Sequence, residues 1–161
     1  MNTTPSIIVL ERKHLIGMSM PMSFAQHDPS LLWKVFQPRK KEIQNRIGEN
    51  LYSLEVYPID FFREFDMQRI FQKWAAIETS DTSLIPNGMQ CIDIFGMYAV
   101  FNYQGTHADA KKFYSFIFQE WLPSSSYILD ERPHFACMDE NYIPNDPYSQ
   151  ETIWIPIQNK R

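Results

Sequence analysis

One carboxylate, Glu55, stands in the middle of the apolar segment LYSLEVY at residues 51–57. Alternation along a strand puts Glu55 and Tyr57 on the same face. A glutamate with a raised pKa beside a tyrosine can act as a general base on water. In an open cleft the same carboxylate can hold a cationic ligand, since a buried carboxylate stays charged only near a donor, a counter-ion or water. A third interpretation is an ion pair with Arg63 or Lys73 at a sheet edge.

The remaining reactive side chains form no second site. The four histidines, at positions 14, 27, 107 and 134, lack the spacing of metal ligands. His134 and Cys137 are three apart on a predicted strand, so their side chains face opposite sides and cannot readily act as base and nucleophile. Glycine-rich phosphate-binding motifs are also missing. The sequence therefore predicts no metal and no cofactor.

Composition and charge limit the class of protein. A chain of 161 residues with 44% hydrophobic residues can bury one substantial core, so we expect a single domain over 1–161. The net charge of -4 has the wrong sign for neutralising many phosphates. No apolar run is long enough for a membrane helix, and the N-terminus lacks a secretory signal. Cys91 and Cys137 are isolated from each other. We expect a cytoplasmic protein that contacts neither nucleic acid nor membrane.

The first helix signal covers residues 27–50. Asp28 can cap the helix, Pro29 suits its first position, and Gly48 ends it. Pro38 should kink the helix or divide it in two. The predicted apolar stripe consists of Leu32, Phe36, Ile43 and Ile47.

The second helix signal covers residues 105–123. Thr106 and Asp109 have the spacing of a capping box, and Pro123 stops the helix. The residues that recur on one face are Phe113, Ile117 and Trp121.

Strand signals surround the two helices, and the order strand, helix, strand, strand occurs twice. The predicted strands are HLIGMSMPM, LYSLEVY, FQKWAAIET, MQCIDIF, MYAVFNY, HFACMD and ETIWIPI, with a hairpin at Gly96 between the fourth and fifth. The order predicts pseudo-repeats over about 6–80 and 88–158, in which Trp74 falls where Trp154 falls. We expect an α+β fold: an antiparallel sheet with both main helices on one face and a ligand groove between the repeats on the other.

Several segments together resemble the GyrI-like small-molecule-binding domain, the effector-binding domain of bacterial transcription activators, which also has stand-alone and integron-cassette members. The resemblance extends over about residues 6–158. The segments that carry it are LWKVFQPRKKEIQNRIGENLYSLEVY, KWAAIETSD, IPNGMQ, YAVFNYQGTHADAKKFYSFIFQEWLP, ERPHFACMDENYIPNDP and IWIPI.

The resemblance implies a cleft for amphipathic, often cationic and aromatic, small molecules. Members of the family typically carry a glutamate where this sequence has Ala136, and many stand-alone members carry an acid where it has Thr152. If the repeats align with Leu54 on Phe135, Glu55 matches Ala136 and supplies the acid from the other half. The predicted ligand-binding residues are Glu55, Tyr57, Trp74, Ala136, Met138, Thr152 and Trp154.

Three functions remain open from the sequence. The first is binding of an amphipathic or aromatic small molecule for sensing or sequestration. In one interpretation this molecule is a cation. Regulatory output would then need a separate regulator chain, and a homodimer is compatible with the sequence. The second is hydrolysis by the same fold, with Glu55 as general base within hydrogen-bond reach of Tyr57 or another hydroxyl. The third is binding to a protein such as gyrase. Binding without catalysis is favoured, because Glu55 has no second catalytic partner.

Overall fold

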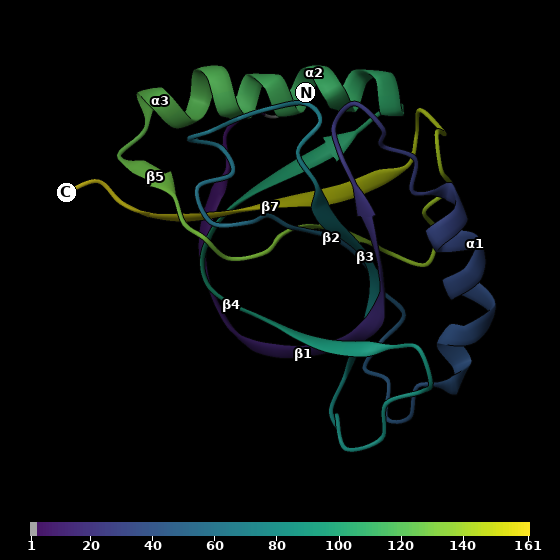
Figure 1. The fold of residues 1–161 in the computed structure, drawn as a ribbon. Coiled ribbons are helices and arrows are strands. Elements are labelled where there is room, and N and C mark those ends of the chain that lie inside the picture. The colour runs from purple at the N-terminus through teal and green to yellow at the C-terminus, as the bar shows by residue number, and fades with distance from the viewer. Residues whose placement is uncertain (1–2) are drawn as a thin grey trace.

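Seven antiparallel strands and two main helices make up residues 3–161, the part of the chain that the computed structural model describes (Figure 1). The two halves of the chain use strands and helices in the same order, with one short extra strand in the second half. The elements are β1 (Ser6–Met22), α1 (Ser30–Arg39), η1 (Lys40–Glu42), β2 (Leu51–Val56), β3 (Phe71–Thr79), β4 (Gln90–Gln104), α2 (His107–Phe116), η2 (Ile117–Trp121), α3 (Leu122–Ser124), β5 (Tyr127–Leu129), β6 (His134–Met138) and β7 (Gln150–Asn159).

The sheet closes on itself. Its strand order is β4-β1-β3-β2-β6-β7-β5, and β4 also pairs with β7, so six strands form a ring. The long strands β1 and β4 close one side of the ring by pairing with each other along both their halves, across a register shift between Leu10 and Lys13. The sheet therefore has an inner face, enclosed by the ring, and an outer face.

Both faces of the sheet are buried, but against different partners. The inner face packs on itself, with residues from all six ring strands. The outer face packs against α1 over β1 and β3, and against α2 over β4 and β7. The inner core comprises Leu15, Tyr52, Leu54, Trp74, Ala76, Ile94, Tyr98, Val100 and Phe135, with Leu10, Val56, Ile92, Cys137 and Trp154 packed against it.

The two central strands, β2 and β6, meet with Leu54 opposite Phe135. Trp74 pairs with Leu54 on one side, and Trp154 pairs with Phe135 on the other. The two tryptophans thus hold equivalent places in the sheet, in agreement with the repeat alignment. An origin of the two halves by duplication stays a prediction.

The hairpin predicted at Gly96 is wrong, because residues 90–104 form the single strand β4. Gly96 has φ of 95° and bends the strand without reversing it. The Arg132 guanidinium packs directly on this glycine, where a Cβ would lie 2.7 Å from Nη1. The glycine therefore serves close packing within a continuous strand.

The first helix is shorter than predicted. Helix α1 ends one residue after Pro38, and the chain continues as the short turn η1. Asp28 accepts a hydrogen bond from the Ser30 backbone N–H at 3.1 Å, although Pro29 occupies the N-cap position. Leu32, Phe36 and Ile43 are buried as expected, whereas Ile47 is 46% exposed because it lies beyond the helix.

The second predicted helix and most of the predicted strands agree with the structure. Thr106 caps α2 and accepts a hydrogen bond from the Asp109 backbone N–H, and the helical path continues through η2 to Ser124. Phe113 and Ile117 are buried, and Trp121 is partly buried against them. Strand β1 begins eight residues before its predicted start, and the short strand β5 was not predicted. No helix within residues 3–161 has the length and apolar character needed to cross a membrane.

Arg132 joins the bend of β4 to the end of β7. Its guanidinium donates hydrogen bonds to the carbonyl oxygens of Phe95, Met97 and Ile157, and pairs with Asp130 at 2.8 Å. Arg132→Ala should lower the free energy of unfolding by about 2–4 kcal/mol, because it leaves half-buried carbonyl groups unpaired. Urea unfolding measures this loss.

The control for this prediction is Arg63→Ala, which removes an arginine with an 82% exposed side chain. That variant should change stability by less than about 0.5 kcal/mol. Equal losses in the two variants would contradict the role given to Arg132.

Candidate functional site

The outer face of β2 and β6 lies between the two helical layers. Glu55 pairs with His134 and Ser53 with Ala136 across the two strands, so these side chains share one face. Tyr57 packs with the outer core under α1, whereas Leu54 and Val56 belong to the inner core. The predicted alternation in LYSLEVY is therefore confirmed. We call this region the inter-helix face; it comprises Ser53, Glu55, Tyr57, His134, Ala136 and Met138.

Three of the predicted ligand-binding residues lie on the other side of the sheet. Trp74 is 7% exposed in the inner core. Trp154 stacks on Phe135 with ring centroids 5.0 Å apart, and its indole N–H donates to Thr152 Oγ1 at 2.9 Å. The expectation that these residues share one cleft with Glu55 is wrong. Ring closure encloses the face without helices, where the groove was expected, and the inner core fills it.

Glu55 forms an ion pair with Lys73, its direct neighbour across β2 and β3. The two charged atoms, Lys73 Nζ and Glu55 Oε1, are 2.7 Å apart, and the side chains are 6% and 17% exposed respectively. Arg63, the other predicted partner, pairs with Asp60. The negative charge of Glu55 is thus neutralised inside the protein.

Aromatic rings cover one end of the inter-helix face. Phe62, from the segment between β2 and β3, stacks on Phe118 of η2 at 5.4 Å and on His134 at 5.6 Å. Tyr57 meets the His134 ring edge-on at 4.9 Å. Burial, with Arg132 nearby, lowers the pKa of His134 to about 3, so its ring is neutral. We call Tyr57, Phe62, Phe118 and His134 the aromatic bridge, because they join the β2–β3 segment to the helical layer of α2.

Glu151 is a second acid on the outer face. It was not among the ligand-binding residues predicted from the sequence. It pairs with Met138 and with Tyr103, both on that face. Burial raises the pKa of its carboxyl to about 7; Lys73 opposes the rise and Glu55 adds to it. No hydrogen bond or ion pair of the Glu151 carboxylate occurs among residues 3–161. Alternation with Ile153 would have placed it here from the sequence.

Tyr114 of α2 lies near both acids. Burial raises the pKa of its hydroxyl well above 10, and the charges of Glu55 and Glu151 add to the effect. Burial and Glu55 act in the same direction on Tyr57. Both phenols are therefore neutral at physiological pH. The inter-helix face, together with its neighbours Lys73, Tyr114 and Glu151, thus combines neutral aromatic rings, one internal ion pair and one acid without a partner among residues 3–161.

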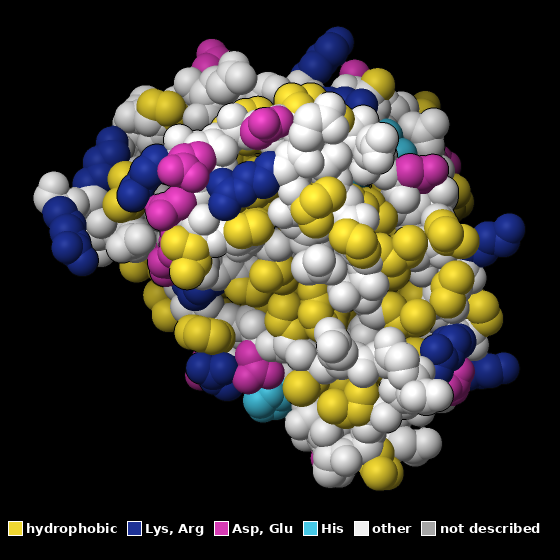
Figure 2. All heavy atoms as spheres, viewed as in Figure 1, with side chains coloured by type: hydrophobic (Ala, Val, Ile, Leu, Met, Phe, Trp, Pro, Cys, Tyr) yellow, Lys and Arg dark blue, Asp and Glu magenta, His cyan; other side chains and the backbone are white. Residues whose placement is uncertain are grey.

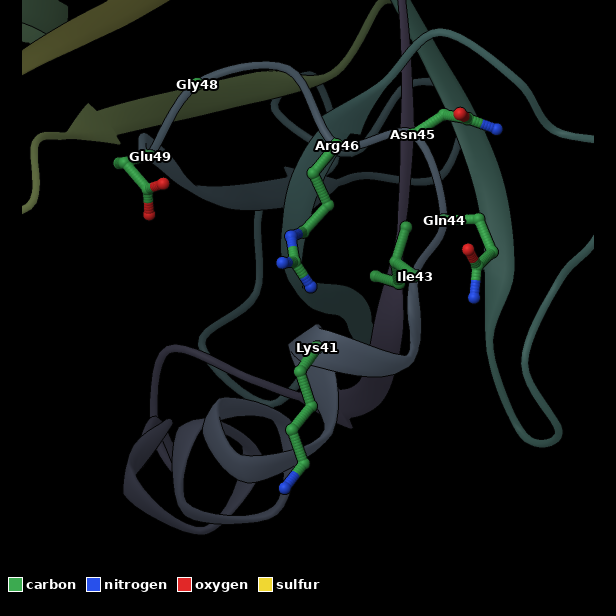
Figure 3. Close-up of a pocket in the computed structure, with 7 residues that line it drawn as sticks. All are labelled: Lys41, Ile43, Gln44, Asn45, Arg46, Gly48 and Glu49. Carbon is green, nitrogen blue, oxygen red and sulfur yellow. The ribbon is translucent and has the colours of Figure 1, made fainter.

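Two surface hollows are lined by other residues. The first follows the loop after α1, where Figure 3 shows the side chains of Lys41, Ile43, Gln44 and Arg46 around a polar, solvent-facing depression. The second is formed by the β6–β7 loop between Asp139 and Gln150. Neither contains a predicted ligand-binding residue. No group of three or more His, Cys, Asp or Glu side chains in the described residues is placed to hold a metal ion.

Comparisons with known proteins agree on the fold. A model of the GyrI-like small molecule binding domain matches residues 3–158. The structure of SAV2435 bound to tetraphenylphosphonium has a TM-score of 0.70 at 14% identity, with 96% of this chain and 93% of that chain covered. The EcmrR C-terminal domain has a TM-score of 0.67 at 10% identity, with 98% of each chain covered.

A hydrolase encoded by lin2189 from Listeria innocua has a TM-score of 0.60 at 9% identity, with 97% of this chain and 92% of that chain covered. No curated protein matches the sequence. At these identities the similar structures show the fold alone.

The buried ion pair generates a stability prediction. Glu55→Gln leaves the Lys73 ammonium buried without a counter-ion, so the free energy of unfolding should fall by about 2–4 kcal/mol. The double variant Glu55→Gln/Lys73→Met removes both charges and should recover most of that loss. Urea unfolding of the single and double variants measures the coupling. A double variant less stable than Glu55→Gln would contradict the pairing.

The raised pKa of Glu151 predicts a pH dependence. Between about pH 4.5 and pH 7 the folded protein holds a proton that the unfolded chain has released, so this group lowers stability as pH rises. Glu151→Gln should therefore gain about 1–3 kcal/mol relative to the unchanged protein between pH 4 and pH 8. Urea unfolding at both pH values measures the difference. The exposed Glu11→Gln should show no such trend, and a constant offset for Glu151→Gln would refute the prediction.

Proposed function

Because this chain belongs to the family of GyrI-like small-molecule-binding domains, we propose that it binds an amphipathic or aromatic small molecule on the inter-helix face. The observation that carries the proposal is the cluster of Phe62, Phe118 and His134, whose three ring centroids lie 5.4–6.1 Å from one another. An aromatic ligand can occupy the place of the Phe62 ring and stack on the same two surfaces. SAV2435, which shares the fold, is bound to tetraphenylphosphonium, a cation with four phenyl rings.

The position of Phe62 favours such an exchange. Its segment, between β2 and β3, carries exposed apolar side chains: Ile59 is 72% exposed and Met67 is 51% exposed. Figure 2 shows hydrophobic side chains spread across the middle of the visible surface, with many charged ones towards its edges. The neighbouring Phe61 is 2% exposed and anchors the segment in the outer core. The partly buried Phe62 side chain is therefore the part that leaves its place when a ligand arrives.

The predicted ligand-binding residues then divide into two groups. Tyr57, Ala136 and Met138 face the ligand in this proposal, with Glu55 below them in its ion pair. Trp74, Thr152 and Trp154 face the inner core, where they support the floor of the site from behind.

The hydrolytic alternative is not favoured. It requires Glu55 to lie within hydrogen-bond reach of Tyr57 or another hydroxyl, but within the described residues the only hydrogen bond of its carboxylate comes from the Lys73 ammonium. The hydrolase of similar fold is distant, at 9% identity. Binding without chemistry fits the site better.

The biological use of binding is sensing or sequestration of the ligand in the cytoplasm. For sensing, a separate regulator chain or a second copy of this chain must read the bound state. The EcmrR C-terminal domain, which is similar in fold, belongs to a protein whose structure is known in complex with DNA. That similarity supports sensing as a use of the fold.

Calorimetric titration with tetraphenylphosphonium tests the proposal. Phe118→Ala should weaken binding about two- to thirtyfold, because it removes one stacking surface worth about 0.5–2 kcal/mol. Phe62→Ala should strengthen binding severalfold, because the ligand no longer displaces a ring.

The control is Phe95→Ala, which removes a 37% exposed ring that contacts Arg12 instead. It should leave the affinity unchanged. Weaker binding in Phe62→Ala would show that this ring contacts the ligand and is not displaced by it.

A further inference from the structure

We propose that two copies of this chain associate through the first half of β1, whose edges pair with each other in an antiparallel arrangement. We call residues 6–10 the free edge. This inference goes beyond the proposed function, because it concerns a different surface and requires no ligand.

The free edge has a strand on one side only. Strand β1 pairs with β3 from His14 to Met22, and β3 ends opposite His14. Residues 6–10 pair with β4, from Val100 to Gly96. No strand within residues 3–161 pairs with their other side. The first half of β1 therefore projects beyond β3 as an edge strand.

The hydrogen bonds of Arg132 show which backbone groups face the open side. The Arg132 guanidinium donates to the Met97 carbonyl oxygen, so the backbone of Met97 points away from β1. Val9 lies opposite Met97. Two opposite residues of an antiparallel pair either exchange both backbone hydrogen bonds or turn these groups away from each other. Val9, and Ile7 two residues before it, therefore turn their N–H and C=O groups to the open side, where no backbone partner occurs within the described residues.

The side chains of the free edge leave it open to association. Ile7, Ile8 and Val9 are 41%, 37% and 73% exposed respectively. Residues 6–10 contain no charged side chain and no proline. Proteins usually protect edge strands with charges or proline, since an exposed apolar edge is a template for pairing with a further strand.

The first half of β4 provides a contrast within the same chain. Residues 90–94 pair with β1 on one side, and no strand of the described residues pairs with their other side. In the middle of this second edge stands Asp93, which bonds to Arg12 at 2.8 Å and to His14 at 2.7 Å. A carboxylate thus protects the edge of β4, whereas apolar β-branched residues form the edge of β1.

A second copy of the chain fits the free edge because this edge is complementary to itself. When the two-fold axis passes at Ile8, Ile7 of each copy lies opposite Val9 of the other copy. These are the residues whose backbone groups face outwards, so the two pairs exchange hydrogen bonds and leave none of these groups unpaired. The side chains meet as β-branched pairs, Ile7 with Val9 and Ile8 with its own counterpart, which are favourable across antiparallel strands.

The length of the interface is limited at both ends. Pro5 precedes the free edge, and the register of β1 shifts between Leu10 and Lys13. Pairing is therefore confined to about five residues of each copy. Interfaces of this size are at the small end of the range for specific association, so the dimer should form only as the protein concentration rises.

Sedimentation velocity of the full chain between about 5 µM and about 500 µM tests the association. The unchanged protein should pass from one chain mass towards two over this range. Val9→Lys should raise the dissociation constant at least about tenfold, because it places a charge in the apolar pairing. The control is Leu84→Lys, which adds the same charge at a side chain that is 67% exposed in the loop between β3 and β4. It should leave the association unchanged.

Cysteine cross-linking tests the register. A Cys91→Ser background removes the exposed native thiol. In this background Ile8→Cys should form disulfide-linked dimers under mild oxidation, because residue 8 faces itself across the two-fold axis. The matched control is Val9→Cys, at a position that is more exposed. It should cross-link several times less, because residue 9 faces residue 7 of the other copy and meets its own counterpart only along a diagonal of about 7–8 Å.

The outcomes decide between the possible occupants of the free edge. A chain that stays monomeric at about 500 µM would overturn the proposal and leave the edge to an extended segment of another protein. Equal weakening by Val9→Lys and Leu84→Lys would place the interface elsewhere. Cross-linking of Val9→Cys as strong as that of Ile8→Cys would refute the self-complementary register. Thermal melting establishes that each variant is folded before these measurements.

Discussion

The closed ring of strands is the constraint on which the rest of this structure depends. Once β4 pairs with both β1 and β7, the sheet has an enclosed face and an outer face, and every strand residue must belong to one of them. Side chains alternate with a period of two, so neighbours in sequence are separated by the whole sheet. The ring therefore decides which polar residues can meet a ligand. Glu55 and Trp74 stand at neighbouring register positions, yet they lie on opposite sides.

The ion pair between Glu55 and Lys73 is the second determinant. The sequence suggested a cationic ligand as one partner of Glu55, but the protein supplies a cation itself, the Lys73 ammonium. Burying such a pair contributes little net stability, whereas leaving one member alone costs several kcal/mol. The two charges therefore offset each other, whereas Glu151 has a raised pKa of about 7 and no ion pair among residues 3–161.

The aromatic bridge links these charges to binding. Its rings come from three places that are distant along the chain: β2 with its following segment, the helical path after α2, and β6. They pack against one another where the two helical layers leave the central strands uncovered. In the proposed binding mode, an aromatic ligand takes the place of Phe62 against Phe118 and His134.

Much of the fold could be predicted from the sequence. The helix with its Thr106 cap, the strand FQKWAAIET and the alternation in LYSLEVY all follow from local patterns, because capping and side-chain alternation are decided by residues close in sequence. The family was likewise identified from the segments together. Local patterns failed at Gly96, where the turn propensity of glycine suggested a hairpin. The reason for that glycine is Arg132, 36 positions away, which needs the space a side chain would fill.

The candidate site, too, could be predicted only in part from the sequence. The alternation of side chains in LYSLEVY determined that Glu55 and Tyr57 share a face. The same alternation in ETIWIPI places Glu151 on the face of Ile153. Only the tertiary structure decided which face is enclosed, which side chain pairs with Glu55, and that Trp74 and Trp154 belong to the inner core. Those outcomes depend on the closing contact between β4 and β7 and on the register of β2 against β3. Such pairings form between segments far apart in the chain, and local periodicity carries no information about them.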